Sequence, residues 1–498
     1  MGFFEGRKNK EASSEIAGSK PYKIKAVKFF AINWRLTLLV AILFLLIGIG
    51  PIVVHAAACA STADGNWSDT NTWSGGGCTG AGGLPGTGDS ITINNIVTLD
   101  TSPTILFITI ANTKSLSADS NSRTLTLTST TGTLFTNNGT FTANNSTVIM
   151  NPDGNVSVTS GSFTDTNAFY NLTLSPTLTT NRTYTAGGAL TINNNLTVSS
   201  SKSAGGLSYL RFYLAGTTNV TGTTFATATG WALTYFTTNN YSLTTNIYTQ
   251  TSMYGFLEAG SSNITITGSG ASVFVVQGLG YWDPGTSTII YTGSSATNIY
   301  PTTYYNLNIG GAATTTTYTA AGNITVTNVL TIVSSSGTNT FDASSRTITL
   351  SGTGTPFVIS ASEVFTPSTS TVVYTHATSA NVSSTTYNNL RTNGAGTYTA
   401  AGAIITNGDV TVSAGTLAMA ANDLTVNGGD ISVVGTLTQT SSNTTIVTTT
   451  GLHWRSWIYY LWQPQHWWRG NHPDHHGGWR SHYLRCPHYC LFFRHQHL

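Results

Sequence analysis

Residues that could act as acids, bases or nucleophiles are scattered through this 498-residue sequence. Between residues 59 and 451 the only histidine is His376, and Glu258 and Glu363 each stand alone in the sequence. A glycosidase needs two carboxylates that face each other at a set separation, and no motif here supplies such a pair. A phosphate-binding loop, a nucleophile elbow and a zinc signature are also missing from the sequence. We therefore expect no catalytic site; the enzyme alternative is polysaccharide cleavage by Glu258 or Asp283.

Two tryptophans, Trp67 and Trp73, could contact sugars or close the end of a stack of β-strands. An exposed indole ring presents a flat apolar face on which a sugar can stack. A buried pair would instead shield strand edges, which otherwise recruit other chains, and we favour this interpretation. Asp64 and Asp69 offer oxygen ligands for Ca²⁺ in the same segment, although their spacing matches no strict calcium loop. We expect no other cofactor.

The four cysteines are Cys59, Cys78, Cys486 and Cys490, too few for a disulfide scaffold in a chain of this length. Cys59 allows two interpretations that exclude each other. In the first, Cys59 forms a disulfide with Cys78, which suits an oxidising compartment. In the second, Cys59 is acylated, because the stretch AAAC at 56–59 loosely resembles a lipoprotein cleavage box.

The first 58 residues have the pattern of an export signal. Residues 36–54 are apolar and uncharged, and the basic region 1–35 before them contains eight Lys and Arg residues, which predicts a cytoplasmic N-terminus. The alanines at 56–58 suit signal peptidase. Segment 36–58 is therefore either a cleaved signal peptide or an uncleaved hydrophobic helix, since about 19 apolar residues can span a bilayer. Both interpretations place the remainder outside the cytoplasm, by the Sec route.

Composition favours strands and argues against a nucleic-acid partner. Only 8% of the residues are charged, 51 are glycine, and Thr, Ser and Asn are abundant. Many β-branched residues combined with little charge suit stacked strands and not disorder. Residues 59–451 carry seven Lys or Arg against fourteen Asp or Glu, a mildly acidic balance that nucleic acid would repel.

A repeated unit organises residues 102–451, with copies near 122–198, 287–350 and 345–412. Each copy has a Tyr-Asn-Leu or Tyr-Asn-Asn-Leu motif followed by a related segment: YTAGGALTINNNLTV, YTAAGNITVTNVLTI or YTAAGAIITNGDVTV. Apolar residues alternate with Thr or Asn, and between 410 and 437 short strands recur every seven residues. This beat favours an all-β fold, a parallel β-solenoid (β-helix) in which each coil buries its apolar row on the next. Tandem β-sandwich repeats are the alternative.

Two regions resemble bacterial surface proteins. The head at 59–101, with Trp67, Trp73 and a Gly-rich loop, resembles the G8-type opening segment of β-rich surface proteins. Residues 90–450 resemble the passenger regions of filamentous adhesins and autotransporter-like proteins in their style of strands and turns. These resemblances imply a repetitive stalk displayed at the cell surface.

Residues 452–498 differ from everything before them, because they hold nine of the eleven histidines and six of the eleven tryptophans. Read one base later, the codons of 463–479 permit the string NLNIGGAATTxTTTAAG, and residues 306–322 read NLNIGGAATTTTYTAAG. We therefore interpret the tail as a further repeat copy in the wrong reading frame. This interpretation removes the metal site that would otherwise be assigned to His472, His475, His476, Cys486 and Cys490.

The sequence as a whole predicts an exported cell-surface protein that works by structure and adhesion, without catalysis. Its partners would be surface glycans or neighbouring cells, and also the membrane if residues 36–54 stay uncleaved. Two alternatives remain open. One is a carbohydrate-binding or polysaccharide-degrading protein on a β-helix scaffold, and the other is a self-assembling component of a surface layer or matrix.

Overall fold

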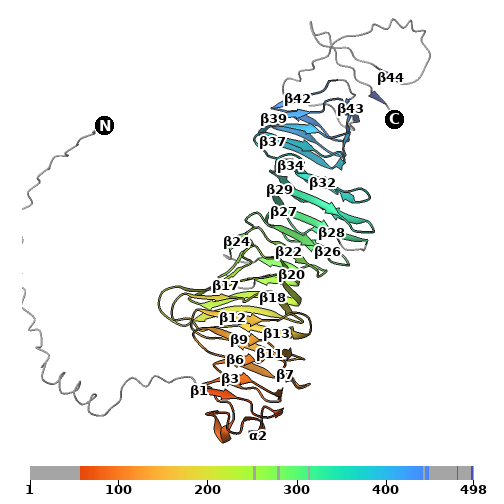
Figure 1. Ribbon diagram of the computed structural model, residues 1–498. Coiled ribbons are helices and arrows are strands. Elements are labelled where there is room, and N and C mark those ends of the chain that lie inside the picture. Colours follow the sequence, from red (N-terminus) through yellow and green to blue (C-terminus); the bar gives the residue numbers. More distant parts are fainter. Residues whose placement is uncertain are drawn as a thin grey trace, which may run out of the picture. The chain divides into compact units, whose positions relative to one another are not determined.

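The computed structural model describes residues 57–250, 254–276, 281–311, 315–440 and 444–447, together with short strands at 479–480 and 495–496. The described residues up to 447 form an all-β parallel solenoid of about 14 turns, and only 3% of the described residues are helical (Figure 1). The apolar segment 36–54 and most of the tail at 452–498 lie outside the described residues. Within the described ranges, no helix has the length and apolar character needed to cross a membrane.

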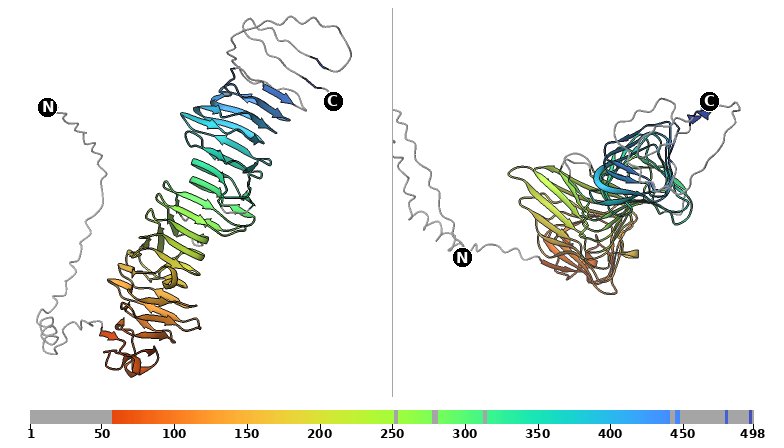
Figure 2. Two further views of the ribbon diagram at one scale, coloured as in Figure 1. Left: turned by 45° about the vertical axis from the view of Figure 1, so that its right-hand side comes forward. Right: turned by 90° about the horizontal axis from the view of Figure 1, so that it is seen from above.

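One sheet runs through the first half of the solenoid and takes one strand from each successive coil. Its ten parallel strands are β1 (Ala57–Ala60), β3 (Asp89–Ile93), β6 (Phe107–Ile110), β9 (Thr133–Asn137), β12 (Val156–Gly161), β14 (Arg182–Thr185), β17 (Ser208–Tyr213), β19 (Ala232–Thr237), β21 (Gly255–Glu258) and β24 (Tyr281–Asp283). Figure 2 shows the coils following one another from red at the N-terminal end to blue.

A second, longer set of parallel strands accompanies the first and continues through the second half. It contains β5 (Thr104–Ile105), β8 (Thr124–Leu127), β11 (Thr147–Met150), β13 (Asn171–Leu174), β15 (Leu190–Ile192), β16 (Leu196–Lys202), β18 (Thr218–Gly230), β20 (Leu243–Gln250), β22 (Asn263–Ile266), β23 (Phe274–Val276), β25 (Thr288–Tyr291), β27 (Thr303–Gly310), β29 (Ile324–Val333), β31 (Thr347–Leu350), β32 (Phe357–Ile359), β34 (Thr371–Tyr374), β35 (Ser379–Val382), β37 (Asn389–Ala400), β39 (Val410–Ala418), β41 (Ile431–Val433) and β42 (Thr436–Thr438).

Three four-stranded parallel sheets complete the coils. They consist of β2 (Gly65–Asn66), β4 (Ile96–Leu99), β7 (Ser115–Ala118) and β10 (Thr140–Thr142); of β26 (Thr297–Ile299), β28 (Thr316–Ala320), β30 (Asn339–Asp342) and β33 (Val364–Thr366); and of β36 (Thr386–Tyr387), β38 (Ile404–Thr406), β40 (Leu424–Asn427) and β43 (Thr444–Val447). The remaining elements are the helical turns α2 (Thr70–Trp73), η1 (Ala81–Gly83) and η2 (Asp165–Asn167) and the antiparallel pair β44 (Trp479–Arg480) and β45 (His495–Gln496).

Alternation along each strand places like residues on top of one another in the core. Leu125, Val148, Leu172 and Leu196 occupy the same register position on four successive strands, and each is at most 1% exposed. Burial of one such side chain stabilises the fold by about 1.5–3 kcal/mol. The Thr and Asn residues between them point outward, so each coil contributes a short apolar row that only its neighbours can cover.

The seven-residue beat corresponds to one side of a coil. Val410 pairs with Ile431, so one coil at this place takes three beats. Leu417 pairs with Leu437, so the next side of the coil is one residue short of three beats. Because all pairings between described strands of the solenoid are parallel, the predicted β-solenoid is confirmed and the β-sandwich alternative is wrong.

The asparagine of the repeated Tyr-Asn-Leu motif joins three coils. Asn306 donates from Nδ2 to the Thr288 hydroxyl of the preceding coil at 3.2 Å, and its Oδ1 accepts from Nδ2 of Asn328 in the following coil at 2.7 Å. The other two copies repeat this arrangement with Thr147, Asn171 and Asn194, and with Thr371, Asn389 and the backbone of Asp409. The repeated motif therefore contributes hydrogen bonds between coils as well as apolar burial.

Candidate functional site

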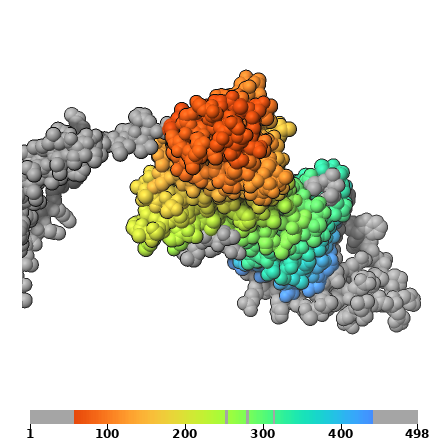
Figure 3. All heavy atoms as spheres, turned by 90° about the horizontal axis from the view of Figure 1, so that it is seen from below, coloured from red at the N-terminus to blue at the C-terminus, as the bar shows by residue number. Residues whose placement is uncertain are grey.

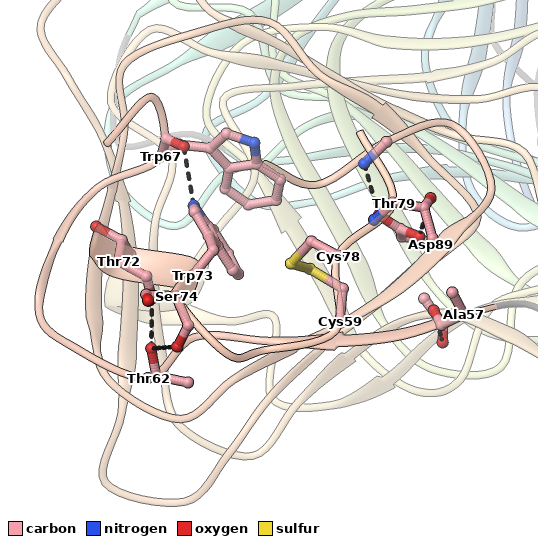
Figure 4. Close-up of a disulfide and its surroundings, with 12 residues drawn as sticks. Ala57, Cys59, Thr62, Trp67, Thr72, Trp73, Ser74, Cys78, Thr79 and Asp89 are labelled. Carbon is pink, nitrogen blue, oxygen red and sulfur yellow. Dashed lines mark hydrogen bonds between the residues drawn. A yellow bond between two sulfur atoms is a disulfide. The ribbon is translucent and has the colours of Figure 1, made fainter. Parts of the chain in front are cut away.

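Residues 57–100 form the N-terminal end of the solenoid, including its first strand β1, and we call them the N-terminal cap. Figure 3 shows these residues in red and orange as a continuous surface at this end of the solenoid. Cys59 on β1 and Cys78 form a disulfide with Cα atoms 4.5 Å apart, and Cys59 is 1% exposed (Figure 4). The bond ties β1 to the Gly-rich loop after α2. It also occupies the Cys59 sulfur, so an acylated Cys59 does not fit this arrangement.

Asp89 holds the same loop from inside the cap. Its carboxylate is fully buried and accepts hydrogen bonds from the Thr79 N–H at 2.9 Å, the Thr79 hydroxyl at 2.5 Å and the Gly86 N–H at 2.7 Å. The Asp89 oxygen and the two cysteine sulfurs lie within 4.8 Å of one another, a cluster of metal-ligand types. Thiolates are the metal ligands, and these sulfurs are joined in a disulfide. We therefore interpret these three residues as holding the Gly-rich loop against β1 and β3.

The two cap tryptophans pack against each other in the interior. Trp67 and Trp73 are 2% and 1% exposed, their ring centroids lie 4.9 Å apart, and their planes meet at 64°. The Trp73 Nε1–H donates to the Trp67 carbonyl at 2.9 Å. Since neither ring has an open face, these residues cannot stack on a sugar in this conformation. The two side chains instead cover the N-terminal end of the hydrophobic core.

Asp64 and Asp69, the residues considered for Ca²⁺, each bond to backbone. Asp64 Oδ1 accepts from the Ile96 N–H at 2.8 Å, which links two parts of the cap. Asp69 is the N-cap of α2, and its Oδ1 accepts from the Asn71 N–H at 2.9 Å. Capping of this kind satisfies the free N–H groups of a helical turn and requires no ion.

The acidic residues considered for catalysis lie in two different places. Glu258 on β21 is in register with Asp283 on β24, so these two carboxyl groups belong to adjacent coils. Glu258 is engaged by Arg211, with Nη2 3.0 Å from Oε1, and by the Thr237 hydroxyl at 2.8 Å. Glu363 instead accepts the backbone N–H of Asn339 through Oε2 at 2.7 Å. The structure therefore places Glu258 and Asp283 on adjacent coils, and Glu258 is already paired with the guanidinium of Arg211.

Large aromatic side chains cover the outward side of three neighbouring strands. On β3 and β14 of the same sheet the outward positions include small hydroxyl residues, namely Ser90 and Thr92 on β3 and Thr183 on β14, although Phe107 lies outward on β6. We define the aromatic face as the outward residues of β17, β19 and β21 and the two exposed residues that precede β17 and β19: Leu207, Tyr209, Arg211, Tyr213, Trp231, Leu233, Tyr235, Thr237, Phe256 and Glu258.

Arg211 lies among the rings of the aromatic face. Its Cζ is 4.5 Å from the ring centroid of Tyr235 and 5.9 and 6.0 Å from those of Tyr209 and Tyr213. Burial disfavours the charged guanidinium, but the hydrogen bond to Tyr213 and the charge of Glu258 outweigh this effect and raise the pKa of Arg211. Arg211 therefore keeps its charge and holds rings from two coils through cation–π contacts.

Tyr235 joins the rings of neighbouring coils into one cluster. Its ring stacks on Phe256, with centroids 4.4 Å apart and planes at 14°, and meets Tyr209 edge-on at 5.7 Å. Burial raises the pKa of the Tyr235 hydroxyl, and the charge of Arg211 partly opposes this effect. The phenol is thus protonated at neutral pH and can donate a hydrogen bond.

The aromatic face has a sequence signal that was overlooked. In the stretch SYLRFYL, the inward Leu210 and Phe212 alternate with Tyr209, Arg211 and Tyr213, where β3 and β14 have Ser or Thr. The aromatic and charged outward residues can be recognised in the sequence once each position of the strand is assigned to the inner or the outer side of the sheet. The partners remain hidden in the sequence, since Arg211 pairs with a glutamate 47 residues away.

No protein-family model matches the chain, and comparisons with curated proteins and with solved structures give no match. The fold of this protein therefore rests on its own strands and their pairing. The resemblances to G8-type segments and to adhesin passenger regions stay predictions.

Proposed function

We propose that this chain is an exported cell-surface protein that acts as a structural and adhesive stalk, without catalysis. The observation that carries the proposal is the parallel stack of about 14 coils. A solenoid gains length by adding coils, and each coil is stabilised mainly by its two neighbours. Such a scaffold suits the display of a contact surface at a distance from its point of attachment.

The disulfide of the N-terminal cap supports export. Disulfides persist in oxidising compartments and are rare in the cytosol. The bond between Cys59 and Cys78 follows directly, in the sequence, on the segment 36–58 that we interpret as an export signal. Oxidation after export would lock the first coil, whose strand β1 forms the end of its sheet.

Surface display is tested with the full chain, tagged at its C-terminus and produced in a bacterial host. A matched variant lacks residues 36–54. We expect external protease to remove the tag from intact cells making the full chain, and alkylation to find Cys59 and Cys78 oxidised. The deletion variant should stay inside with both thiols free. Protection of the full chain on intact cells, together with cleavage after lysis, would contradict export.

The absence of catalysis is tested by measuring new reducing ends or unsaturated products from a panel of polysaccharides. We expect no release, because Glu258 is held by Arg211 and Thr237. Cleavage by the purified chain that disappears in Glu258→Gln or Asp283→Asn would contradict this part of the proposal and favour the enzyme alternative. The self-assembling alternative predicts ordered arrays in electron micrographs of the purified chain.

A further inference from the structure

The aromatic face is not explained by the packing of the solenoid. Its strands already bury a full inward row, which consists of Leu210, Phe212, Phe236 and Leu257. The outward rings add nothing to that row, and Trp231 is 53% and Leu207 61% exposed. Ser and Thr at the same positions of β3 and β14 show that the sheet forms without aromatic residues there. Exposed apolar side chains next to half-buried rings and charged groups are typical of a binding surface.

The rows of the aromatic face run along the solenoid axis. Arg211, Tyr235 and Phe256 occupy equivalent positions on three successive coils. Neighbouring strands of a sheet lie about 4.8 Å apart, which is close to the length that one pyranose adds to an extended polysaccharide. A polysaccharide lying along the solenoid would therefore meet one coil per sugar. Its apolar C–H faces would lie against the exposed ring of Trp231 and the outer edges of the other rings, since Arg211 and Phe256 already lie against the Tyr235 ring.

Polar groups beside the rings suit sugar hydroxyls and give no preference for anions. The Tyr213 hydroxyl lies 3.5 Å from Nη1 of Arg211, and Thr237 donates to Oε2 of Glu258 at 2.8 Å. Guanidinium donors and carboxylate acceptors side by side can bind neighbouring hydroxyls. Glu258 already neutralises Arg211, and Asp283 lies in register with Glu258. The face thus has no surplus positive charge for a uronate or sulfated polymer.

We propose that the aromatic face binds a neutral hexose polysaccharide that lies along the solenoid. This inference supplies the contact partner of the adhesive stalk and in that sense rests on the proposed function, although binding itself does not require export. Tyr235 and Trp231 are the residues on which the affinity depends most. Tyr235 lies at the centre of the ring cluster and can offer its hydroxyl and ring edge, and Trp231, which directly precedes β19, offers the largest exposed ring of the aromatic face.

The test uses the purified full chain in gels that contain dextran, a soluble β-1,4-glucan, a galactomannan or polygalacturonate. We expect at least one neutral polymer, and not polygalacturonate, to retard the wild-type chain. Tyr235→Ala and Trp231→Ala should each weaken binding about tenfold, as truncation of an aromatic anchor does. The matched control is Thr183→Ala, in register with Arg211 on the neighbouring β14, and its affinity should stay within about twofold of wild type.

Folding of the variants is followed by circular dichroism, and because Trp231 is largely exposed its truncation leaves the core intact. Retardation by polygalacturonate alone would overturn the proposal, as would an equal loss of binding in Thr183→Ala. Absence of retardation by all four polymers would overturn it as well, and sedimentation that shifts with concentration would then assign the face to a second copy of the chain. Failure of surface display leaves this result unchanged, since binding is measured on purified protein.

Discussion

The hydroxyls of Tyr291 and Tyr304 lie 3.1 Å apart in the core, and the Tyr304 hydroxyl donates onward to the Tyr300 carbonyl at 2.6 Å. Tyr374 and Tyr387 form the same pair at 3.1 Å in the next repeat copy. Buried hydroxyls are costly without partners. In each pair the two hydroxyls are hydrogen-bonded to each other, and the second also donates to a backbone carbonyl. Two repeat copies thus contain the same polar contact within an otherwise apolar core.

Replacement of Tyr304 by Phe should therefore destabilise the solenoid by about 1–3 kcal/mol, the cost of leaving a buried polar group without its partner. The Tyr300 carbonyl and the Tyr291 hydroxyl would each lose a hydrogen bond. The measurement is the urea midpoint of the full chain. In the double variant Tyr291→Phe/Tyr304→Phe the loss should be smaller than the sum of the two single losses. Additive losses would show that the two hydroxyls are not coupled.

Alkaline pH should unfold the chain in a defined window. Burial raises the pKa of Tyr318 from 10.0 to about 12, so the folded state holds this proton more tightly than the unfolded state. The resulting stability is present in full below pH 10 and is lost as the pH rises toward 12. Absorbance at 295 nm should report phenolate formation together with the loss of strand circular dichroism. Tyr318→Phe should weaken this dependence, whereas titration of all tyrosines near pH 10 with the fold intact would contradict it.

The coil architecture was predictable because it depends on local patterns. Alternation and the seven-residue beat placed Val410 and Val412 on the inner side, and both are fully buried. The aromatic face depends instead on which strand lies beside which. Arg211 and Tyr235 meet because one coil here takes 24 residues, set by the long strand β18 and its turns. Coil lengths vary along the chain, so contacts between outward side chains could not be derived from repetition.

Reduction of the N-terminal cap should loosen the first coil without unfolding the rest. The disulfide between Cys59 and Cys78 closes a loop with a sequence separation of 19, for which chain entropy gives about 3 kcal/mol of stabilisation. We expect Cys78→Ser to increase hydrogen exchange in β1 and β3 and to leave β27 and β29 protected, because solenoid coils depend mainly on their neighbours. Reduced wild-type chain is the matched control and should behave like the variant. Unchanged exchange in β1 would show that the Asp89 hydrogen bonds suffice to hold the cap.

The reading frame of residues 452–498 can be tested directly. The last described strand of the solenoid, β43, pairs with β40 and ends at Val447, five residues before the frame is expected to change. If the tail is a repeat copy read in the wrong frame, sequencing of the gene around codon 452 should reveal a one-base difference. The corrected codons should then encode the Asn-Leu-Asn-Ile-Gly-Gly string found at 306–311. Mass spectrometry of the natural protein can contradict this prediction. Detection of the tryptic peptide GNHPDHHGGWR, residues 470–480, would establish that the printed frame is translated and that the His-rich tail belongs to the protein.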